Sequence, residues 1–290
     1  IAALAHQPTP TWQSLPAQLE ELDDTLSKAW SIVSHLNAVT NSPAWREAYN
    51  GCLAKISAYY TELGQNSDLY NSYQTLADSN EFAELNQAQQ QTINNALRDF
   101  KLSGVALPTE QKQRFAAIEE RLSAICAKFA DNLLDATQAW HKELSPEELA
   151  GIPEANQGLL AQLAQQRGLT GHIVTLDAPA YLAVMMYADN RQLRETVYTA
   201  YCTRASELSN DGKFDNSVLM EEILALRYEQ AQLLGYQHYA ELSLVPKMAS
   251  SVDVVMQFLQ ELAVRAKPAA EKDLAELRAF QDWFLKFELK

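Results

Sequence analysis

The sequence has 290 residues, of which 47% are apolar and 21% charged, and 23 Lys and Arg against 37 Asp and Glu give a formal net charge of −14. An acid excess of this size, without a local run of basic residues, argues against a nucleic-acid partner. Nine glycines and ten prolines are each about 3% of the chain, against averages of about 7% and 5%, which favours long helices over an all-β fold.

The sequence contains no segment typical of a membrane anchor. Its longest uncharged apolar stretch, Ala178 to Ala188, is far shorter than the roughly 20 residues that cross a bilayer. The first residues have neither the basic start nor the apolar core of a signal peptide, so we expect a cytoplasmic protein with no membrane partner. Cys52, Cys126 and Cys202 are too scattered for a disulfide framework, and Cys126 is expected to be a small buried hydrophobe.

The first half of the chain carries explicit helix start and stop signals. Ser42-Pro43 opens a helix that we expect to end at Gly64 in a left-handed conformation, and Asn86 caps one that runs to Ser103. The longest helix is predicted from Thr109 to about Glu143. Its apolar stripe repeats at helical spacing and consists of Phe115, Ile118, Leu122, Ile125, Phe129 and Leu133.

A capping box and a strand follow. Ser145-Pro-Glu-Glu148 predicts the start of a short helix. The side chains of Ser145 and Glu148 should each accept a hydrogen bond from the other residue's backbone amide. Gly168 should end the next helix. The β-branched alternation of His172–Leu176 predicts a strand, whose partner the sequence does not reveal.

Helices resume after the strand. We expect them at 178–188, 191–205 and 216–234, and a last one from Ser251, with Ser250 and Asp253 as an acidic capping box. Pro268 should bend that last helix or split it in two. The predicted fold is therefore mostly α, a bundle-like array of many helices with one short β-strand or hairpin near 172–176.

The histidines do not form a recognisable metal motif. Two ligands on one helix need spacings of three or four residues, and among the histidines only His238, with Glu241, has that spacing in an order that could converge on a metal. We interpret this pair as an exposed helix pair, and His35 as a core or groove-wall residue. We therefore predict no catalytic and no metal-ligating residue; the other histidines are His6, His141 and His172.

Other catalytic patterns are also absent from the sequence. The glycines never fall close enough together for a phosphate-binding loop, and no Gly-x-Ser-x-Gly motif occurs. The acidic pairs Asp23-Asp24, Glu119-Glu120 and Glu221-Glu222 point about 100° apart on a helix and should not share a proton. Tyrosines are numerous, and pairs at helical spacing such as Tyr70/Tyr73 and Tyr198/Tyr201 are interpreted as half-buried packing residues, with a peptide-binding wall as the alternative.

Many segments, in order along the chain, resemble the non-catalytic helical half of the oligopeptidase A and thimet oligopeptidase family of zinc metallopeptidases. These segments are Ser34-His-Leu-Asn37, Asn41-Ser-Pro43, Asn95-Ala-Leu-Arg-Asp-Phe-Lys-Leu-Ser-Gly104, Arg121-Leu-Ser123, Asn132-Leu-Leu-Asp-Ala-Thr137, Glu148-Leu-Ala-Gly-Ile-Pro153, Val174-Thr-Leu-Asp177, Pro179-Ala-Tyr181, Ile223-Leu-Ala-Leu-Arg227, Ala231-Gln-Leu-Leu-Gly235 and Lys247-Met-Ala249. We expect the resemblance to stop near Phe280.

The resemblance implies a two-lobed, mostly helical enzyme that cuts short peptides in a channel between its lobes. The family holds zinc with His-Glu-x-x-His and a later Glu, a motif that this sequence does not contain. Residues 1–290 are therefore expected to be an N-terminal channel-wall portion, truncated before the catalytic zinc domain. We expect this portion to bind no zinc and to be inactive by itself, with short peptides and the missing catalytic domain as its partners and with unknown substrate-contact residues.

Two other hypotheses remain open. The chain could be a free-standing helical module that binds peptides or proteins without catalysis. An enzyme lobe should expose an extensive apolar surface where the missing half docks, whereas an adapted module should not. A weaker hypothesis is a helical enzyme of unknown class that uses His238, Glu241 or Cys126.

Overall fold

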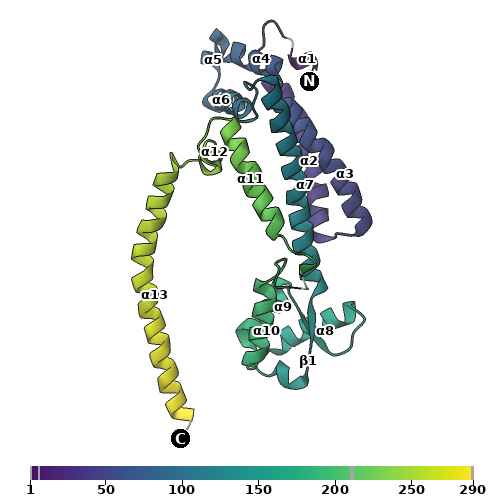
Figure 1. Cartoon of the computed structure of the whole chain (residues 1–290), viewed down its shortest axis with the longest axis vertical. Coiled ribbons are helices and arrows are strands. Elements are labelled where there is room, and N and C mark those ends of the chain that lie inside the picture. The colour runs from purple at the N-terminus through teal and green to yellow at the C-terminus, as the bar shows by residue number, and fades with distance from the viewer. Residues whose placement is uncertain (1, 6, 210–211, 289–290) are drawn as a thin grey trace.

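The computed structural model describes residues 2–5, 7–209 and 212–288, and these are mostly helical, as predicted (Figure 1). The only two strands among them are β1 (His141–Leu144) and β2 (His172–Thr175). The helices are α1 (Ala2–Ala5), α2 (Pro16–Val39), α3 (Pro43–Gly64), α4 (Ser67–Ala77), α5 (Asn80–Glu84), α6 (Gln87–Leu102), α7 (Thr109–Ala139), η1 (Pro146–Leu149, 3₁₀), α8 (Glu154–Gln166), α9 (Ala178–Tyr187), α10 (Arg191–Cys202), α11 (Ser217–Leu233), α12 (Tyr239–Leu244) and α13 (Val252–Glu288).

Predicted cap residues start several helices. The Ser42 hydroxyl accepts from the amide of Trp45, and Asn86 and Ser145 each form a complete capping box with the residue three positions later. The last helix differs from the prediction, because Ser251 rather than Ser250 accepts from the backbone, at the amide of Val254.

Long helices form the first of two units. The helices α2, α3, α7 and α11 lie side by side in Figure 1, with α3 and α11 both packed on α7. Arg114 and Arg121 on α7 make bidentate bonds to Glu229 and Glu222 on α11, with N–O distances of 2.6–2.8 Å. The core of this unit lies at the α1–α4–α6 end; its buried residues include Leu15, Leu69, Tyr73, Leu76, Ile93 and Phe100.

A second unit has its own core. Strands β1 and β2 pair antiparallel, with His141 opposite Thr175 and Leu144 opposite His172. The helices α8, α9 and α10 pack around this hairpin in the lower part of Figure 1. Their shared core, separate from the first, is made of Leu144, Ile152, Leu160, Val174, Ala180, Val184, Ala188, Leu193 and Val197.

The strand partner was the main element missed in the sequence. We placed residues 141–143 at the end of the long helix, but α7 ends at Ala139 and Trp140 is already extended, with φ −92° and ψ 136°. The run His-Lys-Glu-Leu has no β-branched residue. It becomes a strand because it pairs with His172–Thr175, so tertiary pairing overrides its local propensity.

The expectation of a left-handed Gly64 was wrong, and of the two alternatives for Pro268, a bend or a split of the helix, the split does not occur. Gly64 is not left-handed, unlike Gly104, Gly168 and Gly235; a Cβ at Gly64 would meet the Ser103 side chain at 2.5 Å, so this glycine instead permits a close approach of two segments. Pro268 lies inside α13, which continues past it as one helix. An interior proline removes one backbone hydrogen bond and can kink a helix without ending it, and every described side chain around Pro268 is exposed.

The helix α13 stands apart from both units, connected to them through α12 (Figure 1). No helix among the described residues combines the length and apolarity needed to cross a bilayer.

Candidate functional site

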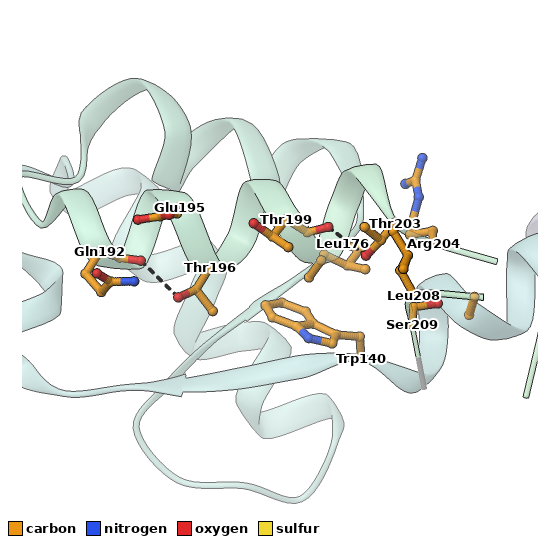
Figure 2. A pocket seen from close by; sticks show the side chains of 12 residues that line it. Trp140, Leu176, Gln192, Glu195, Thr196, Thr199, Thr203, Arg204, Leu208 and Ser209 are labelled. Atoms are coloured by element: carbon orange, nitrogen blue, oxygen red, sulfur yellow. Dashed lines mark hydrogen bonds between the residues drawn. The ribbon is translucent and has the colours of Figure 1, made fainter. Parts of the chain in front are cut away.

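A hollow of about 480 Å³ lies in the second unit, between α10 and the start of β1. Trp140 and the buried Leu176 contribute apolar surface to it, and α10 contributes a row of polar side chains (Figure 2). Together these surfaces form a mixed apolar and polar depression of the kind that binds one side chain of a larger ligand. The described residues that line it are Ala136, Trp140, Leu176, Gln192, Glu195, Thr196, Thr199, Ala200, Thr203, Arg204, Leu208 and Ser209.

The sequence of α10 explains why one of its faces is polar. The side chain of Asn190 accepts from the amide of Leu193 and starts the helix. Leu193 and Val197 are buried in the core of the second unit, so the adjacent stripe faces the hollow. That stripe has spacings of four, three and four residues, which keep side chains on one helix face, and consists of Gln192, Thr196, Thr199 and Thr203.

Two of these threonines present acceptor atoms to the hollow. The Thr196 hydroxyl donates to the backbone oxygen of Gln192 at 2.9 Å, and the Thr203 hydroxyl donates to that of Thr199 at 2.8 Å, as the dashed lines in Figure 2 show. Because each hydroxyl proton is used within the helix, the remaining lone pairs of the oxygen can accept hydrogen bonds. A ligand with N–H donors therefore suits this row.

Two charged residues flank the hollow. Glu195 is exposed on α10, and no other described residue forms an ion pair or hydrogen bond with its carboxylate. Arg204 lies beyond the end of α10, and its guanidinium points away from Trp140 in Figure 2. That guanidinium stacks over the ring of Tyr201, 3.7 Å from the ring centre. The Glu195 side chain is thus less restrained by its neighbours than the Arg204 side chain is.

A second feature is the exposed apolar surface of α13. From Met256 to Phe284 every side chain of this helix is exposed, including many large apolar ones. Monomeric soluble proteins rarely expose contiguous apolar patches larger than a few hundred Å², so α13 has the character of an interface. Its exposed apolar residues are Val254, Met256, Phe258, Leu259, Leu262, Val264, Leu274, Leu277, Phe280, Trp283 and Phe284.

Other helices also expose apolar residues. On α11 these include Met220, Leu224 and Tyr228, at 47%, 67% and 56% exposure, and on α9 they include Leu182 and Met186. Met220 and Leu224 also line an apolar hollow of about 430 Å³ against α7. Exposed apolar surface therefore extends over both units as well as α13.

The predicted pair His238 and Glu241 forms a helix cap. The His238 side chain accepts from the amide of Glu241 at 3.3 Å, and the Glu241 carboxylate accepts from the amide of Gln237 at 2.8 Å. Both side chains are thus used at the start of α12. Among the described residues, no three His, Cys, Asp or Glu side chains gather closely enough to hold a metal ion.

The remaining histidines are separated in the fold. His35 is exposed on α2, so the expectation of a core residue was wrong, whereas the alternative of a groove-wall residue stays a prediction. His141 and His172 lie at opposite ends of the hairpin register. His6 lies outside the described residues.

The three cysteines are free, as predicted, but all three are exposed. The expectation that Cys126 is buried was therefore wrong. The apolar stripe of α7 is buried at Phe115, Ile118 and Ile125, whereas Leu133 is 37% exposed. Cys126 follows Ile125 and points about 100° away from it, toward the open apolar hollow beside Met220.

The adjacent acidic residues act separately, as expected. Asp23 accepts a 2.8 Å hydrogen bond from the Tyr60 hydroxyl, whereas Asp24 pairs with Lys28. Burial together with the hydrogen bond to Asp23 raises the pKa of Tyr60 to about 12. Glu222 pairs with Arg121 on α7.

The tyrosine pairs are divided between packing and exposure. Tyr73 is buried and Tyr70 is half-buried, and both contact Phe100, as the packing interpretation predicted. Tyr201 stacks on Tyr181 with ring centres 4.0 Å apart, whereas Tyr198 is 53% exposed.

The hollow itself was not predicted from the sequence. The available signal was the polar stripe of α10 beside a tryptophan that directly precedes a strand. Only the pairing of β1 with β2 places Trp140 opposite that stripe, and this pairing was not predicted.

Comparison with known proteins finds two family models on the chain. The model of the N-terminal domain of neurolysin and thimet oligopeptidase matches residues 1–112, and that of peptidase family M3 matches residues 184–290. The expectation that the resemblance stops near Phe280 was therefore wrong.

Curated relatives match along nearly the whole chain. Oligopeptidase A of Salmonella typhimurium is 49% identical over 96% of this chain, and that of Escherichia coli is 50% identical over 93%. The organellar oligopeptidase A of Arabidopsis thaliana is 37% identical over 93%. The chain spans only 41%, 40% and 35% of the lengths of these three relatives.

Proposed function

The chain resembles the N-terminal portion of oligopeptidase A, and from that likeness we propose that it forms the N-terminal helical part of a zinc-dependent endopeptidase that hydrolyses short peptides. Residues 1–290 contribute to the wall of the substrate channel, and the zinc and its ligands lie in a further part of the protein. The observation that carries the proposal is identity of about 50% along more than nine-tenths of the chain.

The described residues do not fit a catalytic zinc centre. Such a centre needs three converging protein ligands, and the described residues bring no three candidate side chains together. His238 and Glu241 are used to cap α12. We therefore propose that this portion is inactive alone. From the likeness to bacterial oligopeptidase A we also propose that the complete enzyme acts in the cytoplasm.

The exposed apolar surfaces support this proposal over a free-standing binding module. In an enzyme portion, the apolar residues of α13 would be covered by the rest of the protein. A module that functions alone would leave Phe258, Leu277 and Trp283 facing water, at 61%, 64% and 54% exposure, which favours aggregation.

Three measurements on the purified 290-residue chain test the proposal. We expect no stoichiometric zinc after gel filtration, no cleavage of a quenched fluorescent peptide, and concentration-dependent association in sedimentation. One bound zinc per chain with chelator-sensitive turnover would contradict it, and a strictly monomeric chain would favour the binding module. The coding sequence downstream of Lys290 gives an independent check, because the proposal requires a His-Glu-x-x-His motif there.

A further inference from the structure

We propose that the hollow beside Trp140 binds a positively charged side chain, arginine in preference to lysine, of a short peptide. The proposal rests on the chemistry of the described residues around the hollow and does not depend on a zinc enzyme being completed elsewhere. It names the ligand class of a site that lies in the second unit, between α10 and β1.

The first argument is the aromatic surface. Trp140 is half-buried, packs against the core of the second unit and also lines the hollow. An indole ring that is fixed from behind presents a π surface to a ligand, and tryptophan is the best aromatic partner for a cation. A planar guanidinium stacks on such a surface better than a compact ammonium group does.

The second argument is the pair of hydroxyl acceptors on the polar row. Thr196 and Thr203 use their hydroxyl protons within α10, so their oxygen atoms face the hollow as acceptors. An arginine side chain carries five N–H donors and no acceptor. The donors of an arginine therefore match the threonine oxygens of this polar row.

The third argument is charge. Glu195 lies at the rim without an ionic partner among the described residues. The neighbouring Arg194 keeps its charge, but its guanidinium is held by hydrogen bonds to the backbone oxygens of Ala188 and Asp189 and forms no ion pair with Glu195. Arg204 points away and stacks on Tyr201. The whole chain has a formal charge of −14, which attracts cationic peptides at long range.

The test is an NMR titration of the ¹⁵N-labelled chain, followed at the indole N–H of Trp140, which a Trp140→Phe spectrum assigns. The probe is N-acetyl-arginine amide, and N-acetyl-citrulline amide serves as a neutral ligand of the same shape. We expect saturable shifts of the Trp140 signal with the arginine probe, weaker shifts with N-acetyl-lysine amide, and none with citrulline.

A matched pair of variants distinguishes attraction of the probe by Glu195 from attraction by the net charge of the chain. Glu195→Gln removes the rim charge, and Glu110→Gln removes the same charge from the opposite end of α7. We expect Glu195→Gln to weaken binding of the arginine probe about two- to fivefold, as the loss of an exposed ion pair does, and Glu110→Gln to leave it unchanged. Equal effects of the two variants, or binding of the citrulline probe as tight as that of the arginine probe, would overturn the proposal.

Discussion

The guanidinium of Arg46 on α3 donates both terminal N–H groups to the carboxylate of Asp135 on α7, at 2.9 and 2.8 Å. Its Nε lies 3.2 Å from the carboxylate of Asp131, a residue only 9% exposed. The Arg46 guanidinium thus pairs with two acidic residues where α3 packs on α7. The hydrogen bond from Arg46 holds the pKa of Asp135 below its ordinary value.

Arg46→Met should lower the free energy of unfolding by about 2 kcal/mol, because it leaves two partly buried carboxylates without their cation. Denaturant unfolding followed by circular dichroism measures this. Arg114→Met is the matched control: it removes an equally well-formed bidentate bond at an exposed site and should have a much smaller effect. Equal losses in the two variants would contradict the assignment.

The same pair predicts a dependence on acid. Because the pKa of Asp135 is lowered in the folded state, the stability it contributes is present above the unfolded pKa, near 4, and is lost as the pH falls through the lowered value. The wild-type chain should therefore lose stability more steeply between pH 5 and pH 2 than Arg46→Met does. Thermal melting across that range tests this, and parallel curves for the two proteins would refute it.

Two glycine substitutions should have opposite effects. Gly151 has φ +81°, and a Cβ there would meet the backbone oxygen of Tyr187 and also Asp189 Oδ1, at 2.6 Å. Gly151→Ala should therefore destabilise the chain by about 2–3 kcal/mol. Gly158 lies within α8 with open space around it, so Gly158→Ala should stabilise by about 0.5–1 kcal/mol. Denaturant unfolding measures the free energy of unfolding of both variants. An unchanged value for Gly151→Ala would contradict the close contact of Gly151 with Tyr187 and Asp189.

Glu119 on α7 predicts that stability falls as the pH rises, the reverse of the effect predicted for Asp135. Burial raises the pKa of this carboxyl, which accepts a hydrogen bond from Gln230 on α11. Its contribution to stability is present in full below the unfolded pKa and is lost as the pH rises through the raised one. Glu119→Gln should therefore raise the melting temperature at pH 7 but not at pH 3. Glu120→Gln, on the exposed side of the same turn, should change neither.

Charged substitutions on α13 should reduce self-association without loss of stability. Leu262 and Leu277 are 53% and 64% exposed, so changing both to Glu removes apolar surface from the interface while leaving both cores intact. We expect the sedimentation coefficient to become independent of concentration, with the melting temperature unchanged. Gln260→Glu combined with Gln281→Glu adds the same charge at polar positions. If that control is equally effective, net charge rather than apolar contact governs association.

The sequence alone determined the helices, because their signals are local. The caps at Ser42, Asn86 and Ser145 and the helix end at Gly168 depend on residues a few positions apart. The resemblance to a peptidase family was also available from the sequence, since it depends on the order of many short segments.

Only the tertiary structure decided what the helices face. Strand β1 exists because β2 pairs with it, and this pairing puts Trp140 opposite the polar stripe of α10. The exposure of Cys126 and His35 likewise depends on which helix packs on which side. A periodic pattern shows that a helix has an apolar face, but the packing of other elements determines whether that face is covered, and along α13 it leaves Leu262 and Leu277 in contact with solvent.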